Sequence, residues 1–150
     1  MAFYIKILGH TADNSGAATA KELKILGILP VATDDATPRK SWTGNYLHRP
    51  KLRYVFRVRF EPFKTSDAGS QNTDDWNDLV TTVLNKPYIW LAAPTGPNTL
   101  PPRWAGTLPD MTALFSSPIA VVRTGSIELS DAWTTAEETI ELEFTAKARI

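Results

Sequence analysis

Residues 52–60, LRYVFRVRF, constrain the fold more than any other stretch, because apolar and charged side chains alternate along them. The apolar positions are Leu52, Tyr54, Phe56, Val58 and Phe60. An alternation with a period of two predicts a half-buried β-strand, whereas a helix would bring Arg53, Arg57 and Phe60 onto one stripe. The strand therefore needs a hydrophobic core on one side, and its other side needs water or acidic partners for three arginines.

The C-terminal residues 139–150, TIELEFTAKARI, alternate in the same way and supply acidic side chains. These are Glu141 and Glu143, and the arginines of the first stretch are Arg53, Arg57 and Arg59. We expect the two strands to pair in one sheet, with the acidic residues facing one or more of the arginines. Such cross-strand pairs contribute about 0.2–1 kcal/mol each, so we expect them to set the register more than the stability.

Four other stretches predict further strands. Residues 2–8 predict a short strand. Residues 21–29 fit either a strand or a helical turn, and Gly27 and Pro30 favour the strand. Residues 88–93, YIWLAA, are apolar on both faces, so we expect this strand to be covered on both sides or buried at an interface. Residues 119–130 predict a strand with a bulge at Gly125, forming a hairpin with about 138–150.

One amphipathic helix is predicted, over about residues 74–86. Its apolar residues recur at i, i+3, i+4, i+7 and i+8, and they are Trp76, Leu79, Val80, Val83 and Leu84. Thr73 is the expected N-cap, and Pro87 ends the helix. We expect the apolar face to lie against the sheet, with Trp76 as its largest anchor.

These elements predict a single β-rich domain over residues 1–150. The expected fold is mainly β, a small antiparallel β-sandwich or barrel with one helix packed on it and long loops. The predicted loops are the polar stretches 10–20 and 34–50 and the irregular, proline-rich stretch 94–118, and one helical turn is expected at 110–115. A chain of 150 residues is long enough for one substantial core.

Composition argues against several partners. Sixteen basic and sixteen acidic residues give a net charge of zero, so no overall field attracts nucleic acid or an anionic membrane. No apolar run approaches the roughly 20 residues that span a bilayer. The arginines and aromatic rings of residues 52–60 fall on opposite faces, which disfavours a nucleic-acid-binding sheet. We therefore expect neither a membrane nor sequence-specific nucleic acid as a partner.

The sequence predicts no catalytic, cofactor or metal site, and we do not expect an enzyme. The chain has no cysteine, and a zinc site would need both His10 and His48 together with distant acids. The adjacent acids at 34–35 fit a solvated loop, and those at 74–75 fit a helix N-terminus. Glu141 and Glu143 point the same way on one strand, which fits ion pairing better than glycoside cleavage.

Aromatic residues in the predicted loops point to binding instead. Aromatic side chains and arginines are enriched at protein interfaces. The expected interface residues are Trp42, Tyr46, Arg53, Arg57, Arg59, Trp104, Glu141 and Glu143. The loop tryptophans also leave open a monomeric β-sandwich module that binds carbohydrate, through Trp42, Trp104 or Trp133.

The order of elements resembles the tail-tube and distal-tail proteins of tailed bacteriophages and related contractile injection systems. The resemblance rests on LRYVFRVRF at 52–60, on DDWNDLVTTVLNK at 74–86 running into PYIWLAAP, and on GSIELS to TIELEFTAKA over 125–148. It implies a virion subunit that assembles in the host cytoplasm into a homo-oligomeric ring with other tail proteins, and that has no active site. Residues 94–118 depart from a minimal tube protein, which leaves room for a distal-tail, connector or terminator role.

Overall fold

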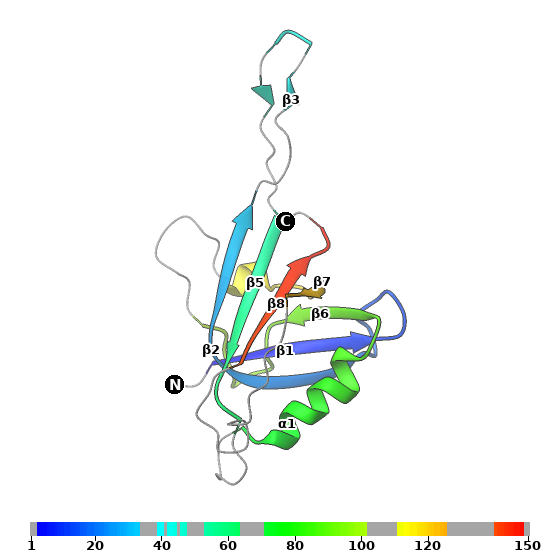
Figure 1. Cartoon of the computed structure of the whole chain (residues 1–150), viewed down its shortest axis with the longest axis vertical. Helices are drawn as coiled ribbons and strands as arrows, with labels where there is room; N and C mark the ends of the chain where they lie inside the picture. Colours follow the sequence, from blue (N-terminus) through cyan, green and yellow to red (C-terminus); the bar gives the residue numbers. More distant parts are fainter. Residues whose placement is uncertain are drawn as a thin grey trace.

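A computed structural model describes residues 3–33, 39–40, 42–44, 46–47, 53–63, 71–101, 111–125 and 140–148. Within these residues six antiparallel strands form a closed barrel in the order β1-β2-β5-β8-β7-β6 (Figure 1). The barrel strands are β1 (Phe3–His10), β2 (Thr19–Thr33), β5 (Arg53–Phe60), β6 (Tyr88–Ala92), β7 (Ile119–Thr124) and β8 (Ile140–Ala146). The mainly β prediction is confirmed, and of its two forms the fold is the barrel.

The long strand β2 turns the corner of the barrel. It pairs with β1 as far as Ile25 and with β5 from Ile25 to Thr33. A register shift between Ile25 and Gly27 forms a β-bulge, which bends the strand so that it serves both neighbours. The predicted strand 21–29 is therefore longer at both ends. The strand also includes Pro30. Proline has no N–H group to donate, and it is tolerated there because no described strand pairs with β2 on the side opposite β5 at that position.

The predicted C-terminal hairpin is confirmed where the structure describes it. Residues Val121 to Thr124 of β7 pair with Glu143 to Ala146 of β8, and residues 126–139 lie outside the described residues. Among the described residues β7 ends at Thr124, and residues 126–130, on which the bulge expected at Gly125 depends, lie outside them. Gly125 has a φ of 76°, a conformation that favours glycine.

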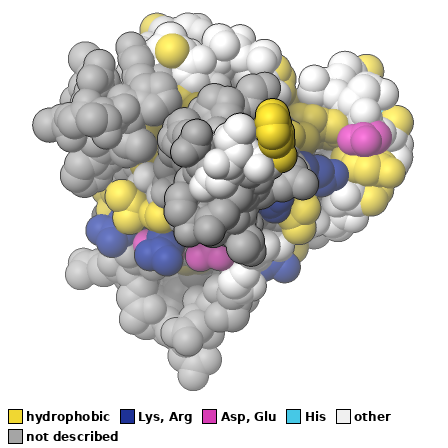
Figure 2. Space-filling view, turned by 90° about the horizontal axis from the view of Figure 1, so that it is seen from above, with side chains coloured by type: hydrophobic (Ala, Val, Ile, Leu, Met, Phe, Trp, Pro, Cys, Tyr) yellow, Lys and Arg dark blue, Asp and Glu magenta, His cyan; other side chains and the backbone are white. Residues whose placement is uncertain are grey.

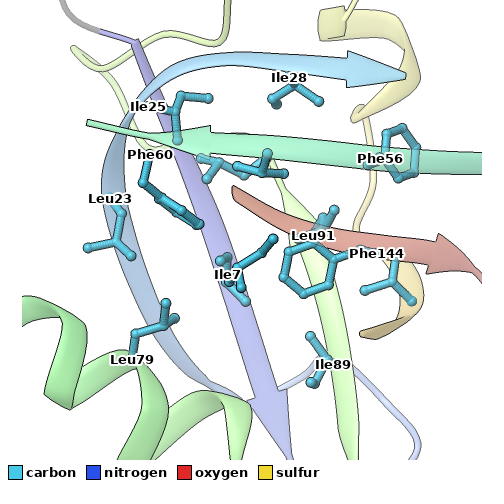
Figure 3. Packing of buried hydrophobic residues seen from close by; sticks show 14 of the residues in the cluster. Ile7, Leu23, Ile25, Ile28, Phe56, Phe60, Leu79, Ile89, Leu91 and Phe144 are labelled. Atoms are coloured by element: carbon cyan, nitrogen blue, oxygen red, sulfur yellow. The ribbon is translucent and has the colours of Figure 1, made fainter. Parts of the chain in front are cut away.

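Side chains fill the inside of the barrel (Figure 3). The largest fully buried side chains of the core are five phenylalanines, each 2% exposed or less: Phe56, Phe60, Phe63, Phe115 and Phe144. The alternation of β5 is confirmed, because Phe56 and Val58 are fully buried whereas Arg57 is exposed. In β6, Leu91 faces this core while Trp90 packs with Leu8 in a second cluster, so that strand is covered on both sides as predicted.

The helix covers one end of the barrel, as α1 (Thr73–Asp78) followed by a π-helical segment η1 (Leu79–Leu84) (Figure 1). The sequence predicted one regular helix with Val80 on its apolar face, but Val80 is 38% exposed. The hydroxyl groups of Thr81 and Thr82 donate hydrogen bonds to carbonyl oxygens four residues earlier. These bonds compete with the regular backbone ladder and favour the wider π-helical turn.

The N-cap of the helix is Asn72, so the prediction of Thr73 was wrong. The Asn72 side-chain oxygen accepts a hydrogen bond from the Asp75 amide at 3.0 Å, and the Asp75 carboxylate accepts one from the Asn72 amide at 3.1 Å. A capping box needs an acceptor three residues after the cap, and Thr73 would have Trp76 there. The predicted anchor is confirmed, because Trp76 is 5% exposed and meets Phe63 edge-on at 5.6 Å.

Two contacts fix the helix against β1 and β2. The Lys21 ammonium lies 3.1 Å from Asp75 and 3.4 Å from Asp78. Partial burial lowers the pKa of Lys21, but the two carboxylates outweigh that effect and leave it above its ordinary value of 10.5. On β1, a methyl group at Gly9 would collide with the carbonyl oxygen of Val83, so glycine allows this close approach.

Two smaller elements complete the described fold. Strands β3 (Arg39–Lys40) and β4 (Tyr46–Leu47) form a separate hairpin that lies beyond the ends of β2 and β5 in Figure 1. The predicted long connection 34–50 therefore contains short strands of its own. The expected helical turn is confirmed as α2 (Met111–Leu114), whose end residues are buried.

Candidate interaction surface

The outer side of β5 and β8 brings together the charged residues that the sequence singled out. In the β5–β8 register, Arg57 lies opposite Glu143 and Arg59 lies opposite Glu141. This confirms the predicted pairing of the two alternating strands in one sheet, with their charges on the same side. Arg53 instead lies opposite Thr33 of β2, beyond the last β5–β8 pair. We call Arg57, Arg59, Glu141 and Glu143 the charged face.

One half of the charged face is held by side-chain contacts. The Arg57 Nε atom lies 3.6 Å from Glu143 Oε2, and the two side chains are 49% and 34% exposed. The other oxygen of Glu143 accepts a hydrogen bond from the Thr124 hydroxyl at 2.8 Å. Because both charges are so exposed, the ion pair contributes little stability, about 0–1 kcal/mol. It orients the side chains across β5, β8 and β7.

The other half of the charged face is open. Arg59 and Glu141 are both exposed, and the structure gives neither an ion pair nor a hydrogen bond with the described residues. Their charges are therefore available to water or to a partner. A partner that approached here would meet a cation and an anion side by side.

A groove runs beside the charged face, over the bulge of β2. It has a volume of about 260 Å³ and is lined by Leu26, Gly27, Ile28, Leu29, Arg57, Arg59 and Glu141. Leu26 is 48% exposed and Leu29 44% exposed, so apolar surface adjoins the charges. Figure 2 shows hydrophobic, basic and acidic side chains adjacent to one another along one side of the molecule. We call this hollow the Gly27 groove.

Of the predicted aromatic residues, the structure describes only the side chain of Trp42, and it lies away from this surface. Trp42 is 97% exposed on the β3–β4 hairpin, and only the backbone of Tyr46 is described, in β4. Trp104 and Trp133 lie outside the described residues. Of the eight expected interface residues, the structure thus brings four together on one face and places Trp42 apart from them.

Sequence reasoning missed the apolar part of this surface. Before the bulge the odd-numbered side chains point inward, and after it the even-numbered ones do, so Leu29 faces outward like Leu26. A single alternation over 21–29 could not predict this change. Gly27 was the available signal, because a glycine inside a strand often marks a bulge or a close approach by another chain or ligand.

Other candidate chemistry has a structural explanation or is not described. The Nδ1 atom of His10 accepts a hydrogen bond from the Ala12 amide at 2.6 Å, which fixes the β1–β2 turn. His48 and the acids at 34–35 lie outside the described residues. In the described part of the chain, no three metal-binding side chains are grouped to hold an ion, and no helix is long and apolar enough to cross a membrane.

A second hollow, of about 500 Å³, lies near α2. Among its described lining residues are Ala113, Ser116 and Ser117, and none of them carries a charge. The described lining therefore offers no charged group, and its one titratable side chain is Tyr54. Comparison of the sequence with protein-family models and with curated proteins found no match.

Proposed function

We propose that this chain is a structural subunit of a virion, a component of a phage tail that acts by self-association into a ring rather than by catalysis. The observation that carries the proposal is the outer side of β2, β5 and β8. There the exposed Leu26 and Leu29 lie beside two arginines and two acids on one sheet. Apolar side chains bordered by arginines are typical of protein interfaces.

The architecture supports the same class. The tail-tube and distal-tail proteins that the sequence resembles share a small β-sandwich or barrel flanked by one helix, with a long loop that reaches neighbouring subunits. The closed barrel, its one helix and the projecting hairpin agree with that architecture. A subunit whose two contact surfaces differ associates head to tail, and such contacts close into a ring when the rotation permits. The role would be that of a tube, distal-tail, connector or terminator ring, assembled in the host cytoplasm with other tail proteins.

Sedimentation velocity at rising micromolar concentration, followed by electron microscopy of any large species, tests the proposal. We expect discrete oligomers that become ring-shaped particles, and weaker association at high salt because exposed charges are screened. A chain that stays monomeric at every concentration, alone and with other tail proteins, would contradict it.

The second candidate function is a monomeric carbohydrate-binding module. The observation that favours it is Trp42, whose indole is 97% exposed and free to stack on a sugar ring. A glycan screen read by tryptophan fluorescence separates the two functions. A specific sugar response that disappears in Trp42→Ala, in a protein that remains monomeric, would favour the module.

A further inference from the structure

Gly27 lines the Gly27 groove, although the fold itself does not require a glycine at this position. Gly27 lies outside the positive-φ region, and a methyl group added to it would meet no atom within 4 Å. Neither backbone strain nor internal packing therefore explains why a side chain is missing at this position. What its absence does produce is the hollow between Leu26, Leu29 and the two arginines.

The lining of the groove selects a single aromatic side chain. Its volume of about 260 Å³ lies below the roughly 300–1,000 Å³ of pockets for drug-sized ligands. The leucines offer apolar contact, and Arg59, which lies opposite Gly27 in the β2–β5 register, can stack its guanidinium on a ring. Glycine has no side chain to cover its own backbone, so an aromatic ring that lies over a glycine in a strand shields that backbone from water.

The chain carries such a side chain on another surface. Trp42 is 97% exposed, the highest value among the exposed large apolar residues of the described chain. It lies at the tip of a hairpin whose strands span two residues each, and an isolated two-stranded hairpin is only marginally stable in water. Docking on a partner would stabilise this hairpin as well as bury the indole.

We propose that Trp42 of one copy inserts into the Gly27 groove of a second copy, between Leu26 and Leu29 and against Arg59. We call the Trp42 side chain the knob. The knob and the groove are different surfaces of one chain, so the contact is head to tail and can propagate around a ring. The inference rests on the self-association proposed above and names the two surfaces that make it.

Two substitutions test the contact from its two sides. Trp42→Ala removes the knob, and Gly27→Leu fills the groove. Because a central tryptophan is a frequent interface hot spot, each change should weaken self-association by roughly thirtyfold or more in sedimentation equilibrium. Val80→Ala, on the exposed side of η1, is the matched control and should associate like the parent. Circular dichroism verifies that all three variants remain folded.

Cross-linking tests the geometry, and the absence of native cysteine makes its background clean. Thr43→Cys places a thiol next to the knob without removing Trp42, and Glu141→Cys places one at the rim of the groove. A short bis-maleimide should join a mixture of these two single variants into dimers. Thr43→Cys mixed with Val80→Cys should not react in this way.

The outcomes separate the two proposals. If the chain associates but Trp42→Ala and Gly27→Leu associate like the parent, or the Val80→Cys pair links equally well, the inference is overturned while self-association stands. If the parent chain never associates, the proposed function fails and the inference fails with it.

Discussion

At the residue scale, the Gln71 side chain forms hydrogen bonds with backbone groups of the barrel, as a neighbouring strand would do. It is 5% exposed, and its amide oxygen accepts a hydrogen bond from the Lys24 amide at 2.6 Å. Its amide nitrogen donates to the carbonyl oxygens of Lys24 at 2.8 Å and Glu61 at 3.2 Å. The side chain thus satisfies backbone groups of β2 at the point where β5 ends.

We expect Gln71→Ala to destabilise the protein by about 1–3 kcal/mol, because the partly buried Lys24 amide and Glu61 carbonyl lose their hydrogen bonds to this side chain. Urea unfolding followed by fluorescence measures the change. Asn77→Ala, at an exposed position of α1, is the control and should stay within about 0.5 kcal/mol of the parent. Equal midpoints for Gln71→Ala and the parent would show that the amide does not hold β2.

At the element scale, the helix and the barrel meet through backbone as well as side chains. The π-helical turn brings the Val83 carbonyl so close to β1 that only glycine fits at position 9. Gly27 on β2 has the opposite environment, with open space where a Cβ would lie. The two strand glycines therefore have different roles, one in packing and one in shaping the surface.

This difference predicts opposite effects of the same substitution. Gly9→Ala should cost about 1–3 kcal/mol, because η1 must move or the strand must bend. Gly27→Ala should be neutral or stabilising by up to about 1 kcal/mol, since it restricts the unfolded chain without a clash. Thermal unfolding of the two variants side by side measures both changes. Melting temperatures lowered equally in both would contradict the distinction.

At the scale of the whole molecule, stability and association depend on different surfaces. The core is enclosed by the barrel and helix, whereas Leu26 and Leu29 contribute apolar surface on the outside. A change to the outer residues should therefore leave folding intact and alter only contacts between copies.

The double variant Leu26→Lys, Leu29→Lys tests this separation. We expect its free energy of unfolding to stay within about 1 kcal/mol of the parent, since surface changes usually cost about 0.5 kcal/mol or less each. Its self-association should fall at least tenfold, because two charges would be desolvated at the contact. Val80→Lys is the control for added surface charge. Loss of folding in the double variant would contradict the assigned exposure.

The chain's own residues determined much of this protein in advance. The alternation of apolar and charged residues predicted that β5 and β8 are strands, and the opposite charges on their outer faces predicted that they pair. The apolar face also restricts the register, because a slip by one residue would turn every apolar side chain outward. The spacing of Trp76, Leu79 and Val83 likewise determined which side of the helix is buried. These are local patterns, repeated at the period of the element itself.

Tertiary structure alone decided the barrel closure, the place of the bulge after Ile25, the role of Gln71 and the Gly27 groove. Each of these joins residues that are distant in sequence, and no periodicity encodes such a meeting. The bulge illustrates the physical reason. β2 must pair with β1 on one side and with β5 on the other, and only the geometry of both neighbours determines where it bends.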